Sequence, residues 1–167
     1  DIHCQGYEPY EQALEQLPVA GQQPLIAVDG ITNPQNLGMI IRSVTASPAH
    51  GLLLPAKGCA DIGPLVIKAS AGTLFKGNIL RCDSLARALK AFKDKGFEIC
   101  TLSSHQAIPL AEFKPTAPVI YVLGNETEGV SKEIAALSDH RVGIPMANGV
   151  ESLNVAITAA LIAFKSL

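Results

Sequence analysis

Residues 144–165 read Ile-Pro-Met-Ala-Asn-Gly-Val-Glu-Ser-Leu-Asn-Val-Ala-Ile-Thr-Ala-Ala-Leu-Ile-Ala-Phe-Lys. The segment begins at the end of a predicted strand, passes through a turn of small and polar residues, and enters a helix that opens at Ser152 to Asn154. The first backbone N–H groups of a helix have no partner within the helix, so such a turn can bind a polar ligand. The sequence therefore predicts a ligand site here, beside an apolar helix.

Upstream of this segment, predicted strands alternate with predicted helices. Apolar runs predict strands at 24–28, 51–54, 78–82, 98–102, 119–123 and 141–144. Helical patterns lie between them at 36–45, 61–70, 83–95 and 131–137. This alternation is typical of an α/β domain with a mostly parallel sheet flanked by helices. Ligands of such sheets bind beyond the carboxyl ends of the strands, which here are followed by loops 33–42, 123–129 and 144–154.

Composition limits the classes of protein that the chain can belong to. Its 167 residues are enough for one domain with its own core. No uninterrupted apolar run is long enough to span a bilayer and no signal segment opens the chain, so we expect a cytoplasmic protein without a membrane anchor. The four cysteines have no C-x-x-C spacing, which argues against a metal site and favours buried, reduced thiols.

The charge of the chain is unevenly distributed. A net charge of −2 argues against binding to nucleic acid by bulk attraction. Residues 57–95, however, hold eight Lys or Arg against three Asp. This segment either meets a phosphate backbone or contains the solvated face of the helix predicted at 83–95.

The first loop contains an N-x-G-x-x-x-R pattern formed by Asn36, Gly38 and Arg42. Arg42 lies nearly two helical turns after Asn36, and its guanidinium is long enough to reach back to the loop. The pattern indicates a phosphate clamp or a catalytic group. The alternative is that Asn36 caps the helix and Arg42 is a surface charge.

The second loop, residues 124–129, places two carboxylates between glycines. Gly124 would let a ligand approach the backbone, and Glu126 can accept hydrogen bonds from hydroxyl or amino groups. The loop has neither the lysine of a phosphate-binding P-loop nor the G-x-G-x-x-G spacing of a dinucleotide fold, which disfavours a triphosphate and NAD. An ordinary tight loop remains the alternative.

Together the three loops resemble the three motifs of the SpoU family of RNA ribose methyltransferases, within the SPOUT superfamily. The matching segments are 33–42, 123–131, 144–146 and 152–156, and residues 68–72 also fit. The resemblance covers the chain from about Pro24 onward, and His3-Cys4-Gln5-Gly6 is similar to the linker that follows a small RNA-binding domain in relatives. It implies a linker or N-terminal extension at 1–20, a catalytic domain at 21–167, and an RNA-binding domain upstream.

The resemblance also implies the chemistry. Relatives transfer a methyl group from S-adenosylmethionine to a ribose 2′-hydroxyl of tRNA or rRNA, without a metal, and their chain ends form a deep trefoil knot, which general topology rules would not suggest. The positions that match the cofactor site are Thr101, Leu102, Leu123, Gly124, Ile144, Pro145, Met146 and Leu153. The positions that match the catalytic or substrate site are Asn36, Arg42, Glu126, Ser152 and Asn154. Because guanidinium stays protonated, we expect Arg42 to bind a phosphate and to stabilise the developing alkoxide.

The closing helix has almost no polar face, so we expect it to be buried on all sides, either within the monomer or in a homodimer of the kind that the resemblance implies. Two other functions stay open. In the first alternative the chain is a non-catalytic RNA-binding relative that keeps the fold. In the second it is an unrelated nucleotide-binding α/β domain that prefers ATP or NAD.

Overall fold

A computed structural model describes residues 7–165, which form a single eight-stranded sheet. The strands are β1 (Tyr7–Pro9), β2 (Leu25–Val28), β3 (Gly51–Pro55), β4 (Ile79–Cys82), β5 (Glu98–Leu102), β6 (Ile108–Pro109), β7 (Val119–Leu123) and β8 (His140–Gly143). Their order in the sheet is β1-β4-β3-β2-β7-β5-β8-β6, and neighbouring strands run parallel. The predicted α/β class with a mostly parallel sheet is confirmed.

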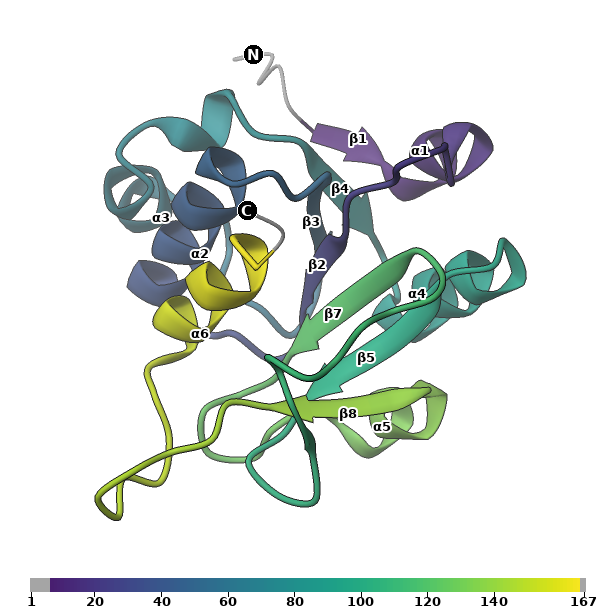
Figure 1. The fold of residues 1–167 in the computed structure, drawn as a ribbon. Coiled ribbons are helices and arrows are strands. Elements are labelled where there is room, and N and C mark those ends of the chain that lie inside the picture. Colours follow the sequence, from purple (N-terminus) through teal and green to yellow (C-terminus); the bar gives the residue numbers. More distant parts are fainter. Residues whose placement is uncertain (1–6, 166–167) are drawn as a thin grey trace.

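Helices cover both faces of this sheet (Figure 1). They are α1 (Tyr10–Gln16), α2 (Pro34–Ala46), α3 (Pro64–Ala69), α4 (Leu85–Asp94), α5 (Lys132–Leu137) and α6 (Val155–Ala163), with a 3-10 turn, η1 (Thr73–Phe75), after α3. Helices α2, α3 and α6 lie on one face, and α1, α4 and α5 on the other. Since both faces are covered, strands β2, β3 and β7 are buried at every position, and alternate residues enter alternate cores.

Strand β2 illustrates how one strand serves both cores. Ile26 and Val28 pack against the α2 side, while Leu25 and Ala27 pack against the side of Phe92 in α4. All four residues of the strand are fully buried. Two details of the predicted elements were wrong or missing: α3 begins at Pro64 after Gly63 rather than at Asp61, and the two-residue strand β6 was not predicted.

The first described residues belong to the same sheet and core. Strand β1 pairs with β4, and α1 buries Tyr10 and Ala13. The ring of Tyr10 lies 6.3 Å from that of Phe92 in α4. Residues 7–17 therefore contribute to the domain that the sequence predicts from residue 21 onward, whereas the resemblance at His3-Cys4-Gln5-Gly6 lies outside the described residues.

Beyond β8 the chain runs out from the sheet as the segment 144–154 and returns as α6, which lies beside α2 (Figure 1). The predicted trefoil knot stays a prediction. The alternative that α6 is buried on all sides within the monomer is wrong, because Ile157, Leu161 and Phe164 are 50%, 46% and 37% exposed. These side chains lie on the face of α6 opposite Ala159 and Ile162, which are fully buried against α2 and the sheet.

Gly38 brings α2 and α3 unusually close together. A Cβ atom built on Gly38 would lie 2.5 Å from Cβ of Ala69 and 2.7 Å from the carbonyl oxygen of Val66. Both distances are shorter than van der Waals contact allows, so only glycine permits this packing. Helix α3 is thereby held against the first half of α2.

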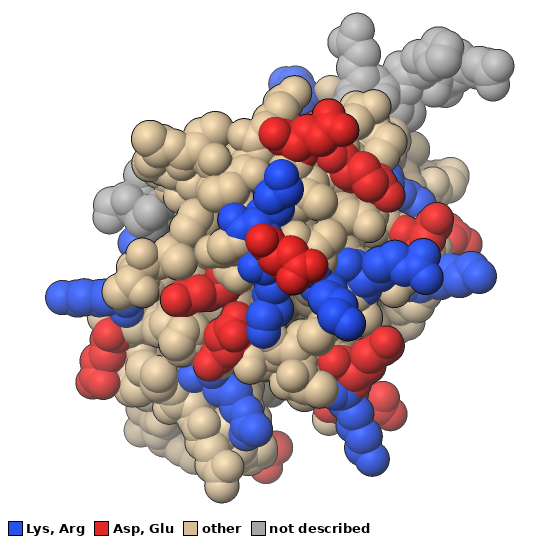
Figure 2. Space-filling view, turned by 90° about the vertical axis from the view of Figure 1, so that its right-hand side faces the viewer, with Lys and Arg blue, Asp and Glu red and all other residues tan. Residues whose placement is uncertain are grey.

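The surface formed by α1, α4 and α5 carries both signs of charge. Figure 2 shows Lys and Arg interspersed with Asp and Glu across it. Lys93 of α4 forms an ion pair with Asp139, with Nζ 3.0 Å from Oδ1. Lys93 thus has an acidic partner, and Lys90 and Lys95 are exposed, which fits the alternative interpretation of a solvated helix face.

Three cysteines fall within the described residues, and all three carry free thiols. Burial raises the pKa of Cys82 and of Cys100 to about 12, and it also raises that of the half-buried Cys59. Within residues 7–165 no three His, Cys, Asp or Glu side chains gather in a way that could hold a metal ion. In the same range, every helix is too short or too polar to cross a bilayer.

Candidate active site

Side chains from three distant loops meet in one hydrogen-bond network. Nδ2 of Asn36 donates to Oε1 of Glu126 at 2.8 Å, and Nδ2 of Asn154 donates to Oδ1 of Asn36 at 3.1 Å. The backbone N–H of Val155 also donates to Oε1 of Glu126, at 3.5 Å. The loops after β2, β7 and β8 therefore converge, as the sequence predicts for the carboxyl ends of parallel strands.

The side chain of Asn36 can take part in the network because a different residue, Asn33, caps its helix. Oδ1 of Asn33 accepts the backbone N–H of Asn36 at 3.0 Å, and Pro34 occupies the first helical position. The alternative interpretation of Asn36 as the N-cap is therefore wrong. Its side-chain amide is available to both Glu126 and Asn154.

Asn125 fixes the loop that carries Glu126. Its Oδ1 accepts the backbone N–H groups of Thr127 and Glu128 at 2.9 and 3.2 Å, and its Nδ2 donates to the carbonyl oxygen of Gly30 at 3.1 Å. Its backbone forms two further hydrogen bonds with Gly129. Asn125 is not among the site residues that the sequence predicts, although asparagine is the typical side chain for such a turn.

Gly124 is needed by the loop itself. A Cβ atom at this position would lie 2.2 Å from the carbonyl carbon of Gly129 and 2.3 Å from the backbone nitrogen of Val130. The backbone of residues 129 and 130 therefore fills the space that a side chain at position 124 would need. The role of its backbone in cofactor binding stays a prediction.

Asn154 has two functions at the start of α6. Its Oδ1 caps the helix by accepting the backbone N–H of Ala156 at 2.8 Å, and its Nδ2 binds Asn36. The carboxylate of Glu126 lies at the same helix start, where the helix dipole favours negative charge. Ser152, two residues earlier, is exposed in the segment 144–154 and has no part in this network.

A small polar cavity of about 90 Å³ adjoins the network. It is lined by residues 30–33, Asn36, residues 125–127 and Val155. Its volume equals that of about three water molecules in the liquid. The cavity therefore suits a hydroxyl-bearing edge of a ligand rather than a whole nucleotide.

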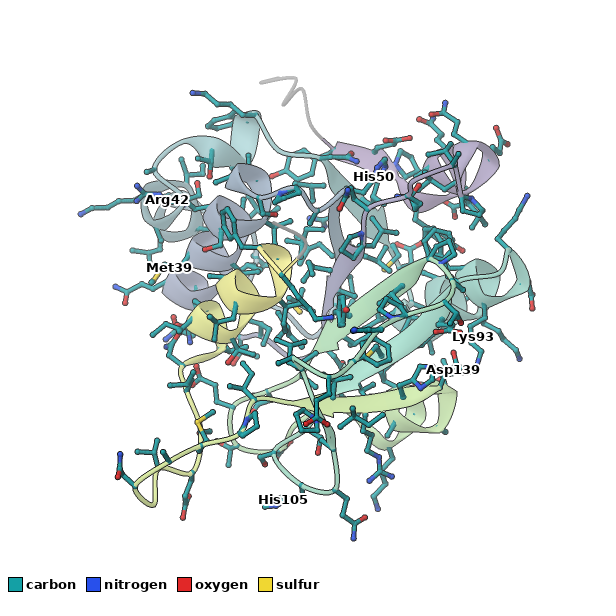
Figure 3. The ribbon with its side chains drawn as sticks, in the orientation of Figure 1. Met39, Arg42, His50, Lys93, His105 and Asp139 are labelled. Atoms are coloured by element: carbon teal, nitrogen blue, oxygen red, sulfur yellow. The ribbon has the colours of Figure 1, made fainter. Side chains whose placement is uncertain are left out.

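Arg42 lies on the outer side of α2, away from the sheet (Figure 3). It is six residues beyond Asn36, or about 9 Å along the helix axis. Its side chain is exposed and has no hydrogen-bond or ion-pair partner among residues 7–165. The guanidinium is thus free to bind an anion, and the structure does not bring it into the network.

The predicted cofactor residues follow three adjacent strands. The β5–β7 and β5–β8 registers pair Thr101 with Val122 and Leu102 with Val142, so Leu102, Leu123 and Ile144 lie at the same edge of the sheet. Thr101 is buried, and its hydroxyl lies 2.8 Å from that of Ser138. This contact connects Thr101 to the loop before β8.

The accessible part of this edge is apolar. Leu102, Ile144, Met146 and Leu153 are half-buried, Leu123 is buried and Pro145 is exposed. None of these side chains ionises. Together with the backbone that follows each strand, they suit a flat, uncharged heterocycle.

Comparison with known proteins identifies the family. Residues 23–164 match the SpoU rRNA Methylase family. This chain belongs to that family. The SpoU chain is 36% identical over 138 residues to an uncharacterized tRNA/rRNA methyltransferase of Mycolicibacterium smegmatis, and the match covers 83% of this chain and 44% of that protein. It therefore spans less than half of the length of that relative.

Solved SpoU structures have the same fold. The SpoU methyltransferase AviRb from Streptomyces viridochromogenes, in complex with the cofactor AdoMet, superposes with a TM-score of 0.79 at 32% identity, covering 92% of this chain and 62% of that chain. The AdoMet-bound rRNA methyltransferase from Sinorhizobium meliloti superposes with a TM-score of 0.82 at 26% identity, covering 96% and 60%. The SpoU fold thus extends over nearly all of the described residues.

Proposed function

We propose that this SpoU domain transfers a methyl group from S-adenosylmethionine to a ribose 2′-hydroxyl of a structured tRNA or rRNA in the cytoplasm. The observation that supports this most is the Asn36–Glu126–Asn154 network, which joins the three family motifs beside a small polar cavity. A methyl transfer from a sulfonium needs little covalent help from the protein. Orientation of the hydroxyl supplies most of the catalysis.

In this proposal the cofactor binds at the carboxyl ends of β5, β7 and β8. Leu102, Ile144, Met146 and Leu153 contact its adenine, and the backbone after Leu123 binds its polar edge. The cofactor supplies the activated methyl group. AviRb and the Sinorhizobium meliloti enzyme were both solved with AdoMet, which supports the choice of cofactor.

The ribose of the target nucleotide enters the polar cavity in this proposal. Asn36 and Asn154 orient its 2′-hydroxyl, Glu126 keeps the Asn36 amide in position, and Ser152 approaches from the segment 144–154. Arg42 binds a phosphate beside the reacting ribose, since its guanidinium has no partner in the protein. Its positive charge also stabilises the alkoxide that forms as the hydroxyl loses its proton.

The exposed apolar face of α6 supports a homodimer. Ile157, Leu161 and Phe164 form this face, and Met39 is exposed on the neighbouring helix α2. Exposed apolar side chains that gather on adjacent helices mark an interaction site, and a symmetric dimer would cover the same face on both copies.

The decisive experiment uses the purified protein, S-adenosylmethionine with a labelled methyl group, and total tRNA and rRNA. Nuclease digestion followed by mass spectrometry should find the label on a ribose 2′-oxygen, and calorimetry should find one cofactor site per chain. Label on a base would contradict the 2′-O assignment. Cofactor or RNA binding without any transfer would instead support the non-catalytic relative.

A further inference from the structure

The layer formed by α2, α3 and η1 is positively charged. Residues 34–77 contain Arg42, Lys57, Lys68 and Lys76 against a single acidic residue, Asp61, in a chain whose net charge is −2. The opposite layer, in contrast, mixes both signs of charge (Figure 2). A surface of net positive charge on a protein of net negative charge attracts a negatively charged partner.

Packing brings three of these cations to one side of α2. Gly38 meets Ala69, and a Cβ atom on Gly77 would meet Oγ1 of Thr45. Arg42 lies four residues after Gly38 and three before Thr45, so all three project from the same side of the helix. Arg42 therefore emerges between the two points where α3 and η1 contact α2.

Lys68 and Lys76 lie at those two contact points. Lys68 directly precedes Ala69, and Lys76 directly precedes Gly77. Both side chains are exposed. Arg42 on α2, Lys68 on α3 and Lys76 directly after η1 are therefore three exposed cations on the same layer of the fold. The level of Thr45 is about 14 Å from that of Asn36 along the helix axis.

An aromatic ring lies in the same surface. Phe75, at the end of η1, is 42% exposed although its neighbour Leu74 is buried. The turn before it is held by hydrogen bonds from Oγ of Ser70 to the carbonyl oxygen of Ile67, at 2.9 Å, and from Oγ1 of Thr73 to that of Ser70, at 2.7 Å. The turn therefore holds the ring of Phe75 out to solvent.

We propose that Phe75, Lys68 and Lys76 form an RNA-docking surface, on which Phe75 stacks against an unpaired base and the two lysines bind the flanking phosphates. An exposed aromatic ring between cations is the usual means of binding single-stranded RNA. This inference rests on the proposed function, because it extends the RNA path from the ribose site, past Arg42, to η1. It assigns to this surface the nucleotides that lie outside the catalytic cavity.

The test compares Phe75→Ala, Phe75→Trp and the double variant K68Q/K76Q with a control, K90Q/K95Q, which removes the same charge from two exposed positions, one on α4 and one directly after it. Dissociation constants for a substrate RNA are measured from low to moderate salt, together with KM, kcat and cofactor affinity. Phe75→Ala should weaken RNA binding roughly tenfold or more, and Phe75→Trp should retain it. K68Q/K76Q should also reduce the slope of log affinity against log salt by about 1.5.

Cofactor affinity and kcat should stay unchanged in all variants. RNA affinity and salt slope that match the control in both Phe75→Ala and K68Q/K76Q would overturn the proposal. So would a change of oligomeric state in Phe75→Ala, because it would make this surface a protein contact. If the wild type transfers no methyl group, the proposed function fails separately, since the loss of RNA binding in these variants can still be measured.

Discussion

Nδ2 of Asn36 lies 2.8 Å from Oε1 of Glu126, although the two residues are 90 positions apart in the chain. Asparagine at position 36 can donate to the carboxylate and accept from Asn154 at the same time, because its amide has both a donor and an acceptor end. No charged residue can do both. The pair therefore explains why an amide, rather than an acid or a base, is found at the start of α2.

Replacing Asn36 with Asp should break this network. The new carboxylate would face that of Glu126 and would lose the donor, so we expect kcat to fall at least about 100-fold and the free energy of unfolding to fall by about 1–3 kcal/mol. Steady-state kinetics and urea unfolding measure both effects. Gln35→Glu adds the same charge one residue earlier at an exposed position and should be nearly neutral. Equal kinetics in the two variants would contradict the role of the network.

Arg42→Ala should remove turnover without destabilising the fold. The side chain has no partner among residues 7–165, so we expect the free energy of unfolding to change by less than about 0.5 kcal/mol. Cofactor affinity, measured by calorimetry, should also be unchanged. Arg42→Lys should recover only part of the activity, because an ammonium lacks the bidentate geometry of guanidinium. Full activity in Arg42→Ala would exclude Arg42 from the mechanism.

Gly124→Ala should disrupt the loop that carries Glu126. Its added methyl group would lie 2.2 Å from the backbone of Gly129, so the loop must open. We expect a loss of stability of about 1–3 kcal/mol together with a loss of activity. Gly63→Ala is the matched control, since a Cβ atom there would have no atom within 4 Å. Native stability in Gly124→Ala would show that the loop can adopt another conformation.

The acid sensitivity of the fold should depend on Asp139. Burial acts to raise the pKa of this carboxyl, but the hydrogen bond from the backbone of Ile99 and the Lys93 ammonium outweigh it, so the pKa is lowered from 3.8. A lowered folded-state pKa means that the ionised group stabilises the fold above pH 3.8 and that this contribution is lost as the pH falls through the folded-state value.

Asp139→Asn should therefore lower the free energy of unfolding at pH 7, and the difference from the wild type should shrink as the pH falls below 3.8. Urea unfolding at a series of pH values measures it. Asp94→Asn, at the end of α4, is a control at a solvent-exposed carboxylate. A difference that stays constant with pH would mean that the packing of Asp139, not its charge, is what matters.

Leu161→Asp should convert a dimer into a monomer. Leu161 lies in the exposed apolar face of α6, where a charge would be buried in the dimer but solvated in the monomer. Sedimentation equilibrium measures the mass. Val19→Asp introduces the same charge at an equally exposed apolar residue elsewhere and should leave the mass unchanged. A wild-type protein that sediments as a monomer would contradict the dimer directly.

The sequence predicts the layers of this fold well, because strands buried on both faces must be apolar throughout and helices must have a polar face. It also places the loops that carry Asn36, Glu126 and Asn154 at one end of the sheet, since the carboxyl ends of parallel strands share an edge. The resemblance to the SpoU motifs is what singles out these three residues. Asn125 is harder to predict as a site residue, because an asparagine in a turn is common and the sequence does not show that its side chain also binds the backbone of Gly30. The exposed face of α6 could not be predicted either, since hydropathy alone does not tell whether the protein itself or a second chain covers an apolar side chain.

Because Gly38 has no side chain, helices α2 and α3 pack in direct contact, and this contact bears on how the proposed RNA substrate could change. Helix α3 rests directly on α2 there, so close packing against α2 fixes the position of α3 relative to the start of α2, where Asn36 lies. Helix α2 thus connects the candidate active site at its start with the proposed docking surface on α3 and η1. If the proposed docking surface binds RNA, changes in residues 64–77 should alter which RNA is bound without moving Asn36.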